Sequence, residues 1–131
     1  MKGTRIRALP LSIALGIALF VTRAAMAHHS FAVFFNTDAQ LVRITGVVRA
    51  FEFRNPHGVI TIVVTKGSEQ VTWRAETNSP SILRRRGWTP ESLHAGDKIT
   101  LEGWPARDGS RYIRLKSALL ADGRAVGQPA P

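Results

Sequence analysis

The stretch that decides the fold class runs from Leu41 to Phe53 and reads LVRITGVVRAFEF. Its β-branched and aromatic residues are typical of a β-strand, and Val42 and Ile44 fall on one face of that strand. Gly46 interrupts the alternation, and the apolar positions then shift by one residue. The positions after the shift are Val47, Phe51 and Phe53. A glycine with a phase shift inside a long strand indicates a bulge or a sharp bend, and such curvature allows a small sheet to close.

Four further strands follow, separated by short segments rich in turn residues. They are expected at Val59–Thr65, Gln70–Glu76, Lys98–Trp104 and Tyr112–Leu120. The turn before the second strand, residues 55–58 (NPHG), contains proline, which lacks the backbone donor that a strand needs. In the third strand Val71, Trp73 and Ala75 alternate with polar residues, so this tryptophan is expected in the core.

A short helix is expected over Asn78–Gly87, between the third and fourth strands. Ser79 is placed to cap its first turn, and Pro80 suits the first helical position, where a backbone N–H is not needed. Gly87 is placed to end the helix. Residues 89–93 repeat the pattern of a capping residue followed by proline, which predicts one further helical turn.

Three strands, a helix and two strands, with a bent first strand, are the element order of a five-stranded OB-fold barrel. The sequence therefore predicts an all-β fold with one short helix, in which the barrel covers residues 41–120. An open β-sandwich or an SH3-like barrel has similar periodicity, and the helix between strands three and four favours the OB-like arrangement. The flanking residues 28–40 and 121–131 are expected to form an extended arm and a flexible tail.

The first 27 residues have the three parts of a secretory signal peptide. A start with three basic residues is followed by an uncharged apolar run over residues 11–21. Ala25 and Ala27 are then placed as the small residues of a cleavage site. The apolar run is shorter than the about 20 residues of a membrane-spanning helix, which disfavours a permanent anchor. We therefore expect export to the periplasm, with cleavage after Ala27 and no membrane anchor in the mature chain.

Composition and charge narrow the classes of function. The chain has 131 residues, with 18 Lys and Arg against 9 Asp and Glu, and no cysteine. This length suits one domain, and the lack of cysteine excludes disulfides, thiol catalysis and thiolate metal sites. Loss of the leader removes four basic residues and lowers the net charge from +9 to +5. Because the exported domain is less basic and is separated from most nucleic acid, no nucleic-acid partner is expected.

Five short motifs, taken in order, resemble those of a known family. They are His28-His29-Ser30-Phe31, Asn55-Pro56-His57, Leu83-x-x-x-Gly87-Trp88-Thr89, Gly96-Asp97-x-Ile99-x-Leu101-x-Gly103 and Ala106-x-Asp108-Gly109-Ser110. In these motifs the chain is similar to a family of small exported bacterial proteins classed as a domain of unknown function. The resemblance covers nearly the whole mature chain. It implies export, a small β-barrel and residence in a Gram-negative periplasm, and it implies no settled activity.

The histidines at the predicted new amino terminus suggest a metal site. If cleavage follows Ala27, the α-amine of His28 and its ring nitrogen can chelate one ion together, and the amine loses its proton at little cost near neutral pH. His29 or His57 is placed to supply a third nitrogen, and nitrogen-rich sites favour Cu(II). The sequence thus predicts a copper site of His28, His29 and His57. Histidines that are merely tolerated at a flexible start and in an exposed turn are the alternative.

Arg84, Arg85 and Arg86, with Trp88 two residues later, form a second candidate site. The arginines suit the negative carboxyl end of the helix, and they are also able to bind phosphate, a polyanionic sugar or a lipid headgroup. Trp88 is placed either to pack on the barrel end or to form a shelf for a ligand. The third strand does not offer the exposed aromatic residues, interleaved with basic ones, that nucleic-acid binding needs.

No catalytic pattern is recognised, so no catalytic residue is assigned. The sequence lacks the metalloprotease, serine-hydrolase, phosphate-loop and dinucleotide-binding motifs. Glu76 is the carboxylate to inspect, because it ends the third strand near His57, and pairing with an arginine is its other interpretation. We expect a non-enzymatic domain that binds a small ligand or a periplasmic protein, with the copper site as its specific hypothesis. The alternative is an accessory module that binds a partner protein, or an anionic oligosaccharide or lipid headgroup, without a metal.

Overall fold

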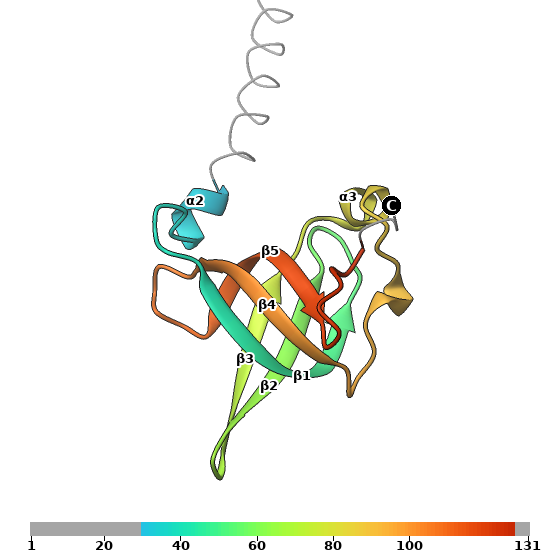
Figure 1. Ribbon diagram of the computed structural model, residues 1–131. Helices are drawn as coiled ribbons and strands as arrows, with labels where there is room; N and C mark the ends of the chain where they lie inside the picture. The colour runs from blue at the N-terminus through green and yellow to red at the C-terminus, as the bar shows by residue number, and fades with distance from the viewer. Residues whose placement is uncertain (1–29, 128–131) are drawn as a thin grey trace, which may run out of the picture. The chain divides into compact units, whose positions relative to one another are not determined.

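The chain forms a closed barrel of five strands (Figure 1). The computed structural model describes residues 30–127, so the predicted leader, His28 and His29 lie outside the described residues. The strands are β1 (Val42–Glu52), β2 (Val59–Lys66), β3 (Glu69–Glu76), β4 (Lys98–Pro105) and β5 (Tyr112–Leu120). The helical elements are α2 (Ser30–Phe34), α3 (Pro80–Arg85) and a 3₁₀ turn, η1 (Pro90–Ser92). In this part of the chain no helix has the length and apolar character needed to cross a membrane.

The hydrogen-bonded order of the strands around the barrel is β1-β2-β3-β5-β4, and β4 closes onto β1. β3 and β5 pair in parallel over residues 74–76 and 112–114, whereas the other neighbours are antiparallel. α3 connects β3 to β4, so the helix lies between the third and fourth strands. This arrangement is an OB-like barrel, and the predicted fold class is confirmed. Closure of the sheet excludes the open sandwich.

β1 is irregular as predicted, but the irregularity has a different position. Ile44, Gly46 and Val48 all face the interior, so the alternation continues through the glycine, and Val47 is exposed. The register shifts only between Val48 and Ala50, where β1 pairs with β2. The predicted phase change at Gly46 is therefore wrong, because the bulge follows the glycine instead of coinciding with it.

Gly46 is required by a close approach between strands. Residues 42–47 pair with β4, whereas residues 47–52 pair with β2, so β1 changes its neighbour around residue 47. A Cβ at position 46 would stand 2.6 Å from the carbonyl oxygen of Val63 and 3.1 Å from the Cδ1 methyl of Ile62. Glycine therefore allows the coiled strand to pass over β2 without a clash.

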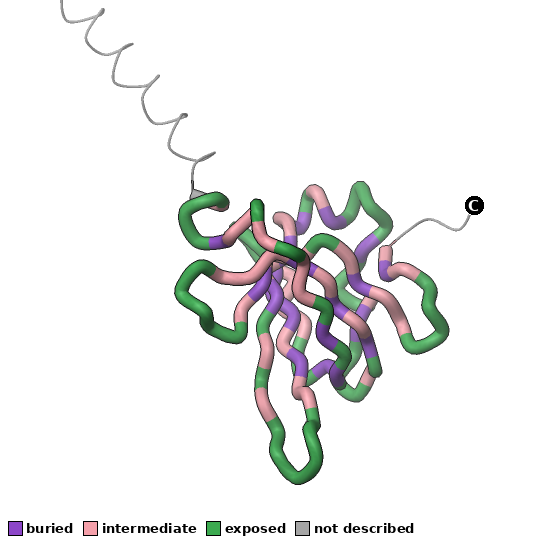
Figure 2. The backbone as a smooth tube through the Cα atoms, turned by 60° about the vertical axis from the view of Figure 1, so that its left-hand side comes forward, coloured by how far each residue is buried: buried purple, intermediate pink, exposed green. Residues whose placement is uncertain are grey.

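The core is built from inward-facing residues of all five strands. Its fully buried large apolar side chains are Ile60, Ile62, Ile99, Leu101 and Ile113. Leu83 of α3 belongs to the same cluster, as do Trp88 and Leu93. Figure 2 shows buried residues alternating with less buried ones along the strands, the period of two that the sequence predicts. α3 and the loop after it therefore pack onto the barrel.

α3 lies within the predicted helix, but its first turn is not capped as predicted. Pro80 occupies the first turn, and Gly87 has a φ of 77°, in the left-handed region that favours glycine after a helix. The side chain of Ser79 makes no capping hydrogen bond, because its hydroxyl pairs with that of Ser81 at 3.0 Å. The predicted Ser79 cap is therefore wrong. At the next turn the predicted cap is confirmed, since Thr89 forms a capping box.

The segment before β1 is not an extended arm throughout. Ser30–Phe34 form α2, so the prediction is wrong for these residues. Phe35 then pairs with Ala106 in an isolated antiparallel bridge and is 2% exposed. Its ring contacts that of Tyr112 at a centroid distance of 5.3 Å. Burial of Phe35 therefore fixes this residue on the barrel a few residues before β1.

The chain after β5 folds back onto the barrel. Leu119 and Ala125 form an antiparallel bridge, and the amide of Val126 donates to the carbonyl oxygen of Ala118 at 2.9 Å. Val126 is buried and belongs to the core cluster. Residues 121–127 therefore return to the barrel, where Val126 supplies an apolar anchor within a stretch of otherwise polar and small residues.

Candidate functional site

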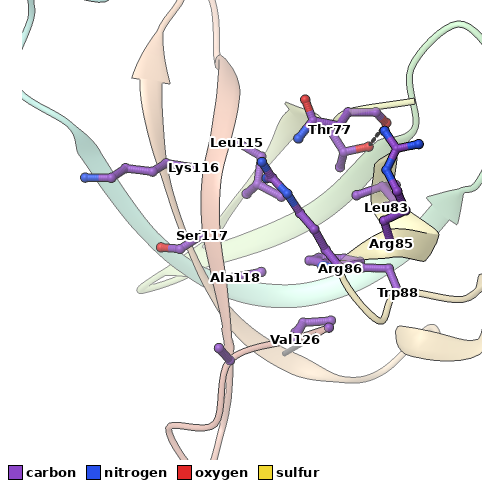
Figure 3. Close-up of a pocket in the computed structure, with 13 residues that line it drawn as sticks. Thr77, Leu83, Arg85, Arg86, Trp88, Leu115, Lys116, Ser117, Ala118 and Val126 are labelled. Atoms are coloured by element: carbon purple, nitrogen blue, oxygen red, sulfur yellow. Dashed lines mark hydrogen bonds between the residues drawn. The ribbon is translucent and has the colours of Figure 1, made fainter. Parts of the chain in front are cut away.

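A pocket lies between α3, β5 and the C-terminal segment 125–127. Its volume is about 460 Å³, within the roughly 300–1,000 Å³ usual for small-molecule sites. This α3–β5 pocket is lined on its different sides by Leu83, Arg85, Arg86, Trp88, Lys116 and Val126, among others. Figure 3 shows the side chains of α3 facing those of β5 and the C-terminal segment.

One wall of the pocket is apolar and belongs to the core. Leu83, Trp88 and Val126 are 3%, 6% and 8% exposed, and Leu115 continues this wall on β5. Trp88 also packs on Phe51, with ring centroids 5.8 Å apart. The two roles predicted for Trp88 are thus compatible, because the same side chain packs on the barrel and lines the pocket.

The other side of the pocket is cationic. Arg85 and Arg86 come from the end of α3, and Lys116 comes from β5. Among the described residues, none of these three side chains has an ion-pair or hydrogen-bond partner, and no Asp or Glu lines the pocket. In Figure 3 the side chain of Arg86 runs from α3 toward Leu115, whereas Lys116 extends away from the arginines. The two arginines are therefore best placed to meet an anion, and Lys116 adds to the positive potential.

The three consecutive arginines do not form a single patch. In a helix of 3.6 residues per turn, neighbouring side chains leave the axis in different directions. The guanidinium carbon of Arg84 lies over the ring of Phe53, 5.0 Å from its centroid. Arg84 is outside the pocket lining, whereas Arg85, Arg86 and Trp88 come together in it. The structure therefore separates Arg84 from the other residues of the predicted ligand site.

Beside the pocket a partly buried carboxylate organises the end of β3. Glu76 accepts a hydrogen bond from the hydroxyl of Tyr112 at 2.9 Å and one from Arg114 at 3.3 Å. Arg114 also donates to the backbone carbonyl of Thr77 and to the side-chain oxygen of Asn78. Because Thr77 and Asn78 line the pocket, this network holds one of its edges in place.

Burial and the Glu76 carboxylate shift the titration of the network. The pKa of Tyr112 is raised to about 12, first by burial and then by its hydrogen bond to Glu76. Burial lowers the pKa of the Arg114 guanidinium, and the charge of Glu76 opposes that change. Repulsion from Arg86 lowers the pKa of Arg114 further, which places Arg86 in the same electrostatic neighbourhood. Arg114 is therefore a further cation near enough to Arg86 to be affected by its charge, and it is itself paired with Glu76.

The polar groups of the pocket are mainly hydrogen-bond donors, since arginine and lysine have no acceptor. The side-chain oxygen of Asn78 is occupied by Arg114, which leaves its amide N–H groups to donate. The indole N–H of Trp88 has no hydrogen-bond partner within residues 30–127. In this part of the chain every fully buried side-chain polar atom does have a partner, so the Trp88 N–H is not fully buried. This N–H therefore keeps some contact with solvent. A negatively charged group with several acceptors matches these donors.

His57 lies beside the same network. Its Nδ1 is 3.2 Å from Oε1 of Glu76, and its side chain is 44% exposed. Glu76 approaches His57 and also pairs with Arg114, as the two interpretations expected, but its side chain is only 20% exposed and so is not the outward-facing charge of the second interpretation. Of the predicted copper ligands, His28 and His29 lie outside the described residues. Within residues 30–127 no group of three or more His, Asp or Glu is arranged to hold a metal.

Sequence reasoning missed Arg114, Asn78 and Val126 as parts of the site. Glu76 and Arg114 meet because they are register partners in the parallel β3–β5 pair. No local sequence motif predicts this pairing. The signal that was available for Arg114 is its position between Ile113 and Leu115, where a charged residue interrupts an apolar stretch. Nothing comparable marks Val126, since its neighbours are typical of a loop.

Comparison with known proteins gives a family and no activity. Residues 17–114 match a family described as a family of unknown function, DUF6152. No curated protein matches the chain. The matched range includes β1 to β4, α3 and the Glu76 network. It ends within β5, so Lys116 and the C-terminal wall of the pocket follow it.

Proposed function

The chain belongs to DUF6152, a family of unknown function, as its motifs indicated. We propose that it is an exported, non-enzymatic domain that binds an anion in the α3–β5 pocket. One observation carries the proposal. Arg85 and Arg86 have no counter-ion among the described residues, and no acidic side chain lines the pocket that they border. Cations left without partners beside a cavity attract a ligand of opposite charge.

The lining of the pocket supports binding over catalysis. Thr77 and Ser117 are the hydroxyl-bearing residues among the described lining, and no His, Asp, Glu, Cys or Tyr accompanies them there. Those are the side chains that most often move protons or activate a nucleophile. Arg85 and Arg86 stay charged at neutral pH and offer forked donors that suit carboxylate and phosphate. The forked donors of the two arginines therefore support a binding role in this proposal.

The binding test uses a local reporter in the pocket wall. The chain has three tryptophans, so its proton–nitrogen spectrum has three side-chain indole signals, and Trp88→Phe identifies that of Trp88. Inorganic phosphate and octanoate are titrated separately. We expect at least one of these anions to shift the Trp88 indole signal in a saturable way. The charge-reversed variant Arg85→Glu/Arg86→Glu should not show this shift.

A matched control separates the pocket from net charge. Arg49→Glu/Lys98→Glu makes the same change in net charge at two exposed residues outside the pocket lining. This control should keep the response of the unaltered protein. The proposal is wrong if neither anion shifts the Trp88 signal, or if the pocket variant and the control respond alike.

Export is proposed from the leader sequence. The test is the intact mass of protein recovered from the periplasm of cells that express the full chain. A mass equal to residues 28–131 supports export with cleavage after Ala27. Retention of the leader, or recovery only from the cytoplasm, contradicts it.

A copper site is the second candidate, and His57 is the observation that favours it. Metal-binding histidines usually direct their second ring nitrogen to a carboxylate, which fixes the ring and its tautomer. His57 has this arrangement, because its Nδ1 faces Glu76 and leaves Nε2 to bind an ion. We propose that the α-amine and ring of His28, with His29 or His57 as a further donor, bind Cu(II) after cleavage.

The copper proposal is tested by titrating Cu(II) into the exported protein and recording the intact mass of the complex. Acetylation of the α-amine should weaken binding strongly, and His57→Ala should weaken it to a smaller extent. His94→Ala is the matched control, because His94 is an exposed histidine beside Asp97 and should leave binding unchanged. Affinity no higher than that of an unrelated protein rejects the site.

A further inference from the structure

The α3–β5 pocket combines two chemically different halves at short range. Leu83, Trp88, Leu115 and Val126 form a nonpolar wall that is continuous with the barrel core. Arg85 and Arg86 border the same cavity and lack counter-ions within residues 30–127. A bare inorganic anion would pair with the arginines but would leave the nonpolar wall exposed to water. A neutral apolar molecule does the reverse.

We infer that the ligand of this pocket is a small amphiphilic organic acid, with one carboxylate or phosphate head and a compact apolar body. The inference rests on the proposed anion-binding function and specifies its ligand class. The acidic head meets Arg85 and Arg86, and the apolar body lies against Trp88 and Val126. The cavity of about 460 Å³ sets the size of the body at that of a small metabolite.

The apolar body supplies most of the affinity. Ion pairs between exposed groups contribute little in water, and both arginines are exposed. Each methylene group that leaves water contributes enough to raise affinity about fourfold when it is fully buried. The arginines instead provide selectivity for a charged head, because a carboxylate or phosphate accepts their forked N–H donors more strongly than a neutral group does.

The same geometry disfavours a sugar polymer. The hydroxyl groups of an oligosaccharide would face Leu83, Leu115 and Val126, where they find no hydrogen-bond partner. The cations are also confined to one side of a single cavity, instead of following an extended groove. Arg84, which would lengthen the row of charges, lies over Phe53 and outside the pocket.

The C-terminal segment limits the size of the apolar part of a ligand that the pocket can hold. Val126 and Gly127 line the cavity, and Gly127 lies directly against the Trp88 ring. A ligand that enters as far as the apolar wall therefore meets this segment and the Trp88 ring. The Trp88 indole reports such entry, since its N–H is not engaged by any described residue.

The test compares ligands that differ in only one half. Acetate, butanoate, hexanoate and octanoate share a head and differ in body, while octanamide keeps the body of octanoate without its charge. Affinities are read from the Trp88 indole signal of the unaltered protein. We expect a two- to fourfold gain per methylene along the series, and octanamide about tenfold or more below octanoate.

A matched pair of isosteric substitutions tests the apolar wall. Val126→Thr places a hydroxyl in the wall and should lower octanoate affinity severalfold while leaving acetate unchanged. Val47→Thr makes the same change at an exposed position of β1 and should alter neither. Because the ligand series is measured on the unaltered protein, its result does not depend on how well these variants fold.

The outcomes separate the ligand class from the proposed function. If phosphate and acetate bind as tightly as octanoate, and Arg85→Glu/Arg86→Glu abolishes all of them, the pocket binds anions and the amphiphilic class is wrong. If octanoate and octanamide bind equally, and the arginine variant has no effect, the anion-binding function itself is wrong. Binding to vesicles of anionic phospholipid, without response to octanoate, identifies a membrane surface and overturns the small-acid class.

Discussion

Gly127 lies so close to the indole ring of Trp88 that a Cβ at position 127 would stand 1.9 Å from Cδ1 and 2.1 Å from Nε1. The contact joins the end of the chain to the loop after α3 and completes one wall of the α3–β5 pocket. Any side chain at position 127 must displace either the backbone of the segment or the Trp88 ring. The contact therefore couples the C-terminal segment to the candidate site.

Gly127→Ala should destabilise the protein more than Gly123→Ala does. Both glycines have positive φ, 74° and 84°, so both substitutions carry a backbone cost of about 1–2 kcal/mol. A Cβ at Gly123 meets no atom within 4 Å, whereas one at Gly127 overlaps Trp88, which adds about 1–3 kcal/mol. Urea unfolding measures both variants. Equal losses of stability would show that the contact with Trp88 is not held in solution.

The phenol of Tyr112 should ionise far above its ordinary range. Its pKa is raised to about 12, so the folded state holds the proton more tightly than the unfolded state does. The resulting stability is fully present below pH ~10 and is lost as the pH rises toward ~12. Because the chain has one tyrosine, its near-ultraviolet absorbance reports this titration directly. A midpoint near pH ~10 in the folded protein contradicts the buried hydrogen bond to Glu76.

Tyr112→Phe isolates the contribution of the phenol to stability at high pH. The variant should lose less stability than the unaltered protein between pH ~10 and ~12, since it has no proton to release there. Urea midpoints measured across this range give the comparison. Parallel pH profiles for the two proteins would show that Tyr112 does not contribute.

Removing the Arg114 side chain should cost more than breaking a surface ion pair. Arg114→Leu leaves the Glu76 carboxylate and the carbonyl of Thr77 without one of their donors, for a loss of about 1–3 kcal/mol. Arg43→Leu breaks the pair with Glu102, in which the arginine is 63% exposed, and should cost less than about 1 kcal/mol. The free energies of unfolding of both variants give the comparison. Similar losses would mean that the burial of Arg114, which is 12% exposed, does not increase its contribution to the free energy of unfolding.

Gly46→Ala should lower stability although alanine suits strands no worse than glycine. The added methyl overlaps the carbonyl oxygen of Val63, and relieving this overlap costs about 1–3 kcal/mol. Val47→Ala, at the neighbouring exposed position, is the control and should change stability by less than about 1 kcal/mol. A stable Gly46→Ala protein would show that β1 tolerates a wider separation from β2.

The regular elements were predictable because their signals are local. Alternation with a period of two marks β2 to β5, and proline and glycine mark the limits of α3, so the element order of the barrel follows from short windows. Details that depend on a partner strand were not predictable. Gly46 occupies an inward-facing position where a side chain would overlap the Val63 carbonyl on β2. The interpretation as a phase change failed because that contact cannot be seen in the segment itself.

In the candidate site, too, local features were predictable and features that depend on distant residues were not. Arg85, Arg86 and Trp88 were identified from adjacent positions, and Glu76 from its place at the end of a strand. Which arginines reach the cavity depends on how α3 is rotated against the barrel, and this rotation sends Arg84 to Phe53 instead. The role of Val126 depends on the turn that returns the chain to Ala118.

The amino-acid sequence by itself determined the class of the fold, the order of its elements and the composition of a basic segment beside a tryptophan. These follow from side-chain periodicity and from the backbone limits of proline and glycine, which act over a few residues. Only the tertiary structure decided that Arg114 reaches Glu76, that Gly127 rests on Trp88 and that a cavity separates two arginines from an apolar wall. Those relationships join residues far apart in the chain, and the pairing of β3 with β5 and the return of the C-terminal segment bring them together.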